Sequence, residues 1–291
     1  MALSTTTATE LTAEQVSTIL TRPLEQASVF LAAGPTVFDT NGSPVRIPKA
    51  PAPDPEALEW VGQNELIPEH DPEFDETILL PETMKSVKTI TRYSNELARQ
   101  SIVALDSVLQ ARLVADVAGK IDGQFLSDAG DGITTPRGLF AYDATSDGIT
   151  EVDAAGPLTL DVLLAAQGAA LEANVNPESL RLLIRPADLM ALRSLKDGDQ
   201  RYMLEPNATA SAGMTILGMQ AHVTARIPAG RAAVLDMQQI AVARDLAPSV
   251  KVLTERYADY DQQAIRVVAR YDAAPLNPEA IVSISGITST P

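Results

Sequence analysis

The sequence predicts an α+β protein organised around one very long helix. Apolar residues recur at helical spacing from Tyr93 to Leu126, in a stretch that no proline interrupts. Residues 48–81, in contrast, are so rich in proline that neither a long helix nor a central strand fits them. Helical and strand patterns then alternate over residues 151–250. Helices and strands arranged in this way are typical of the α+β class.

The first turn of the long helix indicates where the helix starts, and the residue count gives its length. Ser94 is a favourable N-cap residue, and Glu96 places a carboxylate near the positive end of the helix dipole. From Asn95 to Leu126 the helix would contain 32 residues, which corresponds to roughly 48 Å. The mean globular helix has only about a dozen residues. We therefore expect this helix to act as a strut.

Two lines of apolar residues follow the predicted helix. The main line steps by three and four and lies on one face: Ala98, Ile102, Leu105, Leu109, Leu113 and Val117. A second, thinner line is expected on nearly the opposite side: Val103, Val114, Ile121 and Phe125. Both faces should therefore be covered.

Composition limits the classes of function. The chain has 291 residues, and 45% of them are hydrophobic, which is enough for a real core. The 22 basic and 38 acidic residues give a net charge of −16, which argues against a nucleic-acid reader with a basic footprint. There is no cysteine, so disulfides and cysteine-ligated metals are excluded. Neither a secretory signal nor an apolar run of membrane-spanning length is present, so we expect no membrane association.

The residues before the long helix are expected to form an arm and an extended loop. Thr12 and Gln15 form a capping-box pattern, which predicts a short helix that ends near Arg22. Asn41-Gly42 between two short β-type runs indicates a hairpin. The proline-rich loop that follows carries Trp60, the only tryptophan. Trp60 either contacts a partner or folds back on its own domain, and the sequence leaves both readings open.

Residues 151–250 are predicted to form a separate α+β unit. Its helices are expected at 158–173 and 187–195, and its strands at 180–184, 214–217, 220–224, 232–236 and 250–255. The final strand, 263–271, is expected to pair with a strand far upstream.

No catalytic machinery is visible in the sequence. His70 and His222 lie in an acidic loop and a predicted strand, where lone histidines are usually structural or solvated. The G-x-S-x-G, P-loop and G-x-G-x-x-G fingerprints are absent. Asp128 and Asp131 lie in a Gly-rich turn that lacks the spacing and the terminal Glu of an EF-hand. We therefore predict that the chain is not an enzyme and that it holds no cofactor and no metal.

The order of several short motifs resembles the tailed-phage major capsid protein family. These motifs are Tyr93-Ser94-Asn95-Glu96-Leu97 at the start of the helix, Ile121-Asp122-Gly123-Gln124-Phe125-Leu126 at its end, Thr135-Pro136-Arg137-Gly138-Leu139 after a Gly-rich turn, and Arg270-Tyr271-Asp272 near the C-terminus. Each motif alone is weak, but their shared order extends over residues 24–285.

The resemblance implies the α+β fold known as Hong Kong ninety-seven, with the long helix as its spine. The parts would be an N-terminal arm (1–33), an extended β-hairpin loop (34–92), the first part of a peripheral domain with the spine helix (93–150), an axial domain (151–250), and a peripheral return with the C-terminus (251–291). It also implies hexamers and pentamers in an icosahedral shell that encloses double-stranded DNA, and hence a place in the virion capsid.

The resemblance implies partners and contact residues as well. A separate scaffolding protein and a portal are expected, a decoration protein is compatible, and packaged DNA would be held without sequence-specific contact. The expected inter-subunit contacts are Trp60, Val61 and Glu65 in the loop and Val103, Val114, Ile121 and Phe125 on the helix. Two alternatives stay open: an encapsulin-like nanocompartment shell, and an acidic oligomeric enzyme, which would need a pocket with perturbed titratable groups.

Overall fold

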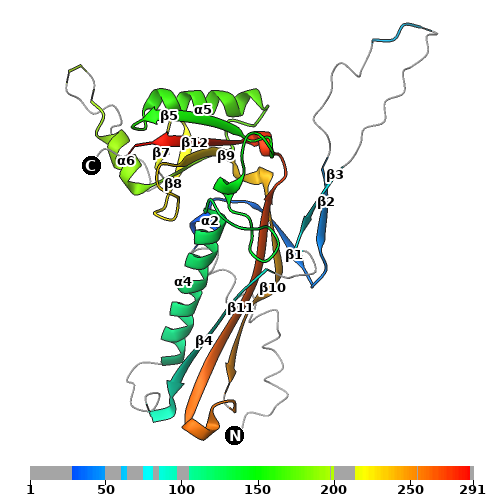
Figure 1. Cartoon of the computed structure of the whole chain (residues 1–291), viewed down its shortest axis with the longest axis vertical. Helices are drawn as coiled ribbons and strands as arrows, with labels where there is room; N and C mark the ends of the chain where they lie inside the picture. The colour runs from blue at the N-terminus through cyan, green and yellow to red at the C-terminus, as the bar shows by residue number, and fades with distance from the viewer. Residues whose placement is uncertain are drawn as a thin grey trace, which may run out of the picture.

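The computed structural model describes residues 28–49, 60–63, 75–80, 85–96, 105–196, 198–199, 214–253 and 255–288. These residues form two sheets and a two-stranded ribbon, with helices packed on both sheets (Figure 1). The predicted α+β class is confirmed. The expected helix at 12–22 and two of the expected contact residues, Glu65 and Val103, lie outside the described residues.

The first sheet has four strands in the order β1-β10-β11-β4. Its members are β1 (Thr36–Thr40), β10 (Ile240–Leu253), β11 (Gln262–Pro275) and β4 (Ser86–Ser94). The strand β4 pairs antiparallel with β11, with Thr91 opposite Ile265. The strand expected at 263–271 therefore pairs far upstream as predicted, but it is not the final strand, because another strand follows it at Ile281–Ile287. Side chains alternate along β11, so Ile265, Val267 and Ala269 are buried on one face whereas Arg266 is exposed on the other.

The long helix covers the buried face of this sheet. The described helix α4 runs from Leu105 to Phe125 and ends one residue before the predicted end. Residues 95–96 are also helical, and residues 97–104 lie outside the described chain. The short helix α2 (Val29–Ala32) packs against the end of α4, where the Phe30 and Phe125 rings meet edge to face at 5.1 Å.

The second sheet has six strands in the order β5-β12-β9-β6-β8-β7. Its members are β5 (Thr150–Gly156), β12 (Ile281–Ile287), β9 (Ala232–Asp236), β6 (Leu180–Ile184), β8 (Met219–Val223) and β7 (Thr215–Ile216). Helices α5 (Leu160–Glu172) and α6 (Pro186–Arg193) pack into its core. The opposite face of this sheet contributes Leu183, Ala233 and Ile281 to the core around α4. The core around α4 and the core that includes α5 and α6 therefore meet at this sheet.

Two strands do not follow the expected boundary at residue 250 between the axial domain and the peripheral return. The strand β12 lies in the six-stranded sheet, whereas the resemblance places residues 251–291 in the peripheral return. The strand β10 starts at Ile240 in the four-stranded sheet, ten residues earlier than the strand expected at 250–255. Two charged residues interrupt the apolar pattern of β10. Arg244 forms an ion pair with Asp39 at 2.6 Å, and Asp245 forms one with Arg270 at 2.7 Å.

A ribbon of β2 (Val45–Lys49) and β3 (Asp75–Leu79) projects from the body (Figure 1). The ladder is antiparallel, with Lys49 opposite Asp75 at its outer end. The predicted hairpin around Asn41-Gly42 is wrong, because β1 pairs with β10 and β2 pairs with β3. Gly42 adopts a positive φ of 82°, and its N–H donates to Asp245 at 3.0 Å. The turn therefore directs the chain from one sheet into another.

Candidate functional site: subunit contacts

Trp60 lies beyond the projecting ribbon. Residues 60–63 are described well beyond the outer end of β2 and β3 (Figure 1). Trp60 is fully exposed, at 104% of its reference area, and Val61 beside it is exposed as well. Trp60 thus does not fold back on the described part of its own subunit, which favours the reading that it contacts a partner.

The described members of the second apolar line on α4 do not lie on nearly the opposite side from the main line, which corrects that expectation. Ile121 and Phe125 are only 2% exposed and belong to the subunit's own core, while half-buried Val114 packs against that core. Successive helix residues are rotated by about 100°. Ile121 therefore lies only about 40° beyond Val117, so the two lines form one broad buried face.

A buried carboxylate anchors the start of the described chain to α4. Asp122 accepts hydrogen bonds from the Ser28 hydroxyl and from the N–H groups of Val29 (2.8 Å) and Phe30 (3.2 Å). The Ser28 hydroxyl in turn accepts from Leu31 and caps α2. This cluster ties the N-terminus of α2 to α4.

Substituting Asp122→Asn should release this anchor without unfolding the subunit. The amide offers one acceptor oxygen in place of two and carries no charge, so we expect a loss of about 1.5–3 kcal/mol. Hydrogen exchange of the Val29 and Phe30 amides should accelerate, which mass spectrometry can measure. Asp116→Asn, at an exposed site on the same helix, should change neither quantity. Unaltered exchange at both amides in Asp122→Asn would contradict the anchoring role.

A second buried carboxylate fixes the root of the ribbon. Asp272 accepts from the Lys85 ammonium at 2.6 Å and from the Leu80 N–H at 3.0 Å. The side chains of Lys85 and Asp272 are only 6% and 2% exposed. Leu79 and Leu80 pack with Ala241 and Ala243 of β10 beside this pair. Charge and packing together hold β3 against the four-stranded sheet.

The titratable groups after α4 stabilise a loop. The Asp131 carboxylate accepts from the Thr134 hydroxyl and from the N–H groups of Ile133, Thr134 and Thr135, which hold its pKa well below its usual range. Burial would raise the pKa of Asp147, but its bond to the Arg137 guanidinium lowers it on balance. Their shifted pKa values thus have structural causes.

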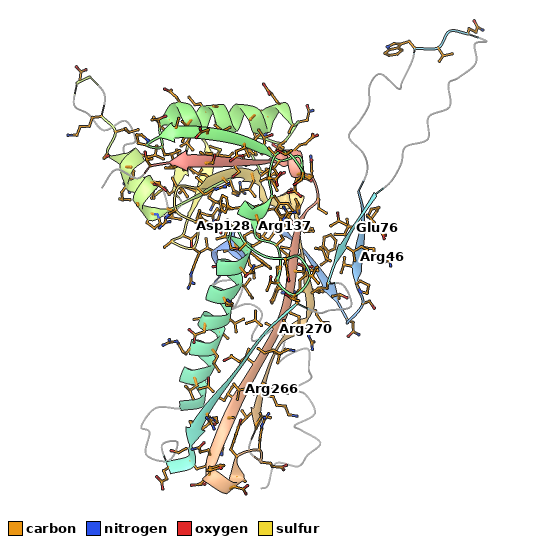
Figure 2. The ribbon with its side chains drawn as sticks, viewed as in Figure 1. Arg46, Glu76, Asp128, Arg137, Arg266 and Arg270 are labelled. Atoms are coloured by element: carbon orange, nitrogen blue, oxygen red, sulfur yellow. The ribbon has the colours of Figure 1, made fainter. Side chains whose placement is uncertain are left out.

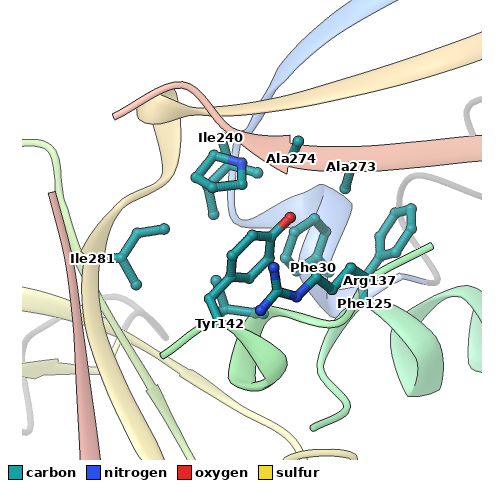
Figure 3. A pocket seen from close by; sticks show the side chains of 10 residues that line it. Phe30, Phe125, Arg137, Tyr142, Ile240, Ala273, Ala274 and Ile281 are labelled. Carbon is teal, nitrogen blue, oxygen red and sulfur yellow. The ribbon is translucent and has the colours of Figure 1, made fainter. Parts of the chain in front are cut away.

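Arg137 also contacts an aromatic ring that packs against the core around α4. Its guanidinium lies over the Tyr142 ring at 4.2 Å, and burial raises the pKa of Tyr142 to about 12 (Figure 3). The hollow beside them has a volume of only 10 Å³, which is room for about one water molecule. This hollow cannot hold a substrate.

The remaining candidate ligands and bases do not converge in the described chain. Asp128 is exposed in the loop, and burial together with Arg181 lowers the pKa of half-buried His222. Among the described residues, no group of three His, Cys, Asp or Glu side chains could hold a metal ion. His70 lies outside the described ranges.

Sequence reasoning missed a basic surface on the face of the four-stranded sheet that α4 does not cover. We call it the basic face and define it by Lys88 and Arg92 of β4, Lys251 of β10, and Arg266 and Arg270 of β11. Figure 2 shows Arg266 and Arg270 along β11. Ile90, opposite Arg266, is 42% exposed on the same face. The alternation of charged residues along β4 and along β11 is visible in the sequence. The sequence does not reveal that these two strands are neighbours.

Comparison with known proteins identifies the family. The sequence matches the model of the phage capsid family over residues 10–286. The chain belongs to the phage capsid family. A phage capsid protein is a structural protein of the virion, so the predicted role as a capsid protein and the predicted place in the virion are confirmed. Family membership also favours a structural role over an enzymatic one.

Solved structures agree with this member of the phage capsid family in fold. The capsid of a native GTA particle is 14% identical with a TM-score of 0.71, covering 89% of this chain and 90% of that chain. A structure of Mycobacterium phage Bobi is 17% identical with a TM-score of 0.69 over 89% and 90% of the two chains. One of Gordonia phage Cozz is 12% identical with a TM-score of 0.61 over 90% and 87%. A search of curated proteins gives no match.

In the described residues, no helix is long and apolar enough to cross a membrane.

Proposed function

We propose that copies of this chain assemble into hexamers and pentamers of an icosahedral shell that encloses the double-stranded DNA of a tailed phage. The observation that supports this most directly is that Trp60, which lies beyond the outer end of the ribbon of β2 and β3, is fully exposed (Figure 1). An aromatic side chain in water contributes nothing to subunit stability, whereas its burial between subunits stabilises an assembly. In this proposal the four-stranded sheet with α4 is the peripheral domain, and the six-stranded sheet is the axial domain.

The proposal includes further partners. A separate scaffolding protein would guide assembly, a portal would occupy one vertex, and a decoration protein could bind the finished shell. The net charge of −16 fits a container that holds DNA without tight or sequence-specific contacts, because strong phosphate binding would impede packaging.

The proposal is tested by assembly of the purified protein. Sedimentation velocity and electron microscopy should reveal capsomers or closed shells, formed alone or with a scaffolding protein. A monomer that persists under both conditions would contradict the proposal. Shells isolated from the host should protect DNA against nuclease. Shells that instead contain a protein cargo would identify a nanocompartment.

A further inference from the structure

A pocket opens at the free edge of β4, the outermost strand of the four-stranded sheet. It has a volume of 280 Å³ and lies between the last turns of α4, the start of β4 and residues 134–136. Its floor consists of buried or half-buried nonpolar and aromatic side chains: Val87, Ile121, Phe125 and Tyr271. Its exposed rim carries positive charge from Lys88 and Lys120.

The size and chemistry of the pocket suit one aromatic side chain. A volume of 280 Å³ can accommodate an indole ring but not a folded segment. An apolar floor stabilises the body of the ring, and ammonium groups at the rim are attracted to its face. Within the described chain, Trp60 is the fully exposed tryptophan that such a pocket would accommodate.

The surroundings of the pocket and of Trp60 are complementary in charge. Lys88 lines both the pocket and a shallow groove of 490 Å³ on the basic face, which also involves Arg266 and Arg270. The sequence after Trp60 is acidic, with six carboxylates between Glu65 and Glu76. A loop that placed Trp60 in the pocket would bring negative charge toward the basic face. Such complementarity contributes orientation and association rate.

A second copy of the chain is the source of the tryptophan. The ribbon carries residues 60–63 away from the four-stranded sheet and α4 of its own subunit (Figure 1). Nucleic acid is a poorer candidate for the adjoining basic face, because exposed Ile90 and half-buried Val268 alternate there with the charges. Phosphate contacts require donors and gain nothing from aliphatic side chains.

We propose that Trp60 of one subunit binds in the pocket between α4 and β4 of a second subunit. The inference rests on the proposed shell function and assigns the pocket as the receptor for the ribbon. Trp60 is the anchor, the floor of the pocket buries its ring, and Lys88 and Lys120 orient the acidic loop that follows.

The single tryptophan makes the proposal directly measurable. Fluorescence of Trp60 should be red-shifted and open to acrylamide in dissociated subunits. On assembly the emission should shift to the blue, and the acrylamide quenching constant should fall at least threefold. Shells in which Trp60 stays red-shifted and quenchable would overturn the inference while leaving the shell function intact. Absence of shells would instead contradict the proposed function.

Variants of the pocket test where Trp60 binds. Val87→Phe adds volume to the floor of the pocket, and Lys120→Glu reverses charge at its rim; each should raise the protein concentration needed for assembly at least tenfold. Arg112→Glu, at an exposed site on the same helix, should not. Circular dichroism should show that all three variants fold. Normal assembly and a normal blue shift in both pocket variants would place Trp60 elsewhere.

The absence of cysteine allows a positional test. Chains carrying Val61→Cys and chains carrying Lys120→Cys should form a disulfide with each other on oxidation after co-assembly, and neither should do so alone. A blue shift on adding duplex DNA to dissociated subunits, without cross-linking, would point to nucleic acid and reject the proposal.

Discussion

Replacing residues 50–74 by an Asn-Gly turn is expected to give a folded subunit that forms no shells. Lys49 and Asp75 are directly opposite at the outer end of the ribbon, so a two-residue type I′ turn can close the ladder without strain. The root of the ribbon keeps its packing through Leu79 and Leu80. The replacement therefore removes the loop that carries Trp60 and leaves the described body intact.

The experiment measures folding and assembly separately. Circular dichroism and the midpoint of urea unfolding should stay close to the values of the unmodified chain. Sedimentation velocity should show the loss of every species above the free subunit or capsomer. A matched control replaces residues 50–74 with a Gly-Ser linker of equal length, which keeps the reach but removes Trp60 and the acidic residues. Shells from either variant would show that the loop is not an assembly element.

The elements that the sequence predicted well are those fixed by local chemistry. The expected helix at 158–173 is α5, whose start is set by Thr159, which accepts a bond from the Val162 N–H. The strand Leu180–Ile184 was predicted with its correct ends. It lies between β9 and β8 and is covered on both faces, so its apolar residues form a continuous run that is easily recognised.

The features that the sequence did not reveal depend on partners far along the chain. β1 resembles half of a hairpin with β2, yet it pairs with β10 about 200 residues later. The basic face exists only because β4 and β11 are neighbours. The position of Ile121 was misjudged for a different reason: spacing places a residue around a helix, but the packed neighbours decide how wide the buried face is.

The buried pair of Lys85 and Asp272 should be the most sensitive point of the subunit. In Asp272→Ala, the Lys85 ammonium would remain buried at 6% exposure without its partner. Removing one member of a buried pair costs about 3–5 kcal/mol, a large fraction of the roughly 5–15 kcal/mol that stabilises a typical domain. We expect the midpoint of urea unfolding to fall accordingly, and shells to be lost as the root of β3 loosens.

A second variant separates the charge from the hydrogen bonds. In Lys85→Met with Asp272→Asn the buried charges are gone, while the Asn oxygen still accepts from the Leu80 N–H that Asp272 now binds at 3.0 Å. This double variant should recover most of the lost stability, since apolar replacement of buried ion pairs is often neutral. Glu76→Gln, which breaks the exposed pair with Arg46 on the same ribbon, should cost at most about 1 kcal/mol. Equal losses in Asp272→Ala and Glu76→Gln would mean that burial does not set the strength of the pair. In that case packing of Leu79 and Leu80 alone would orient the ribbon toward its neighbour.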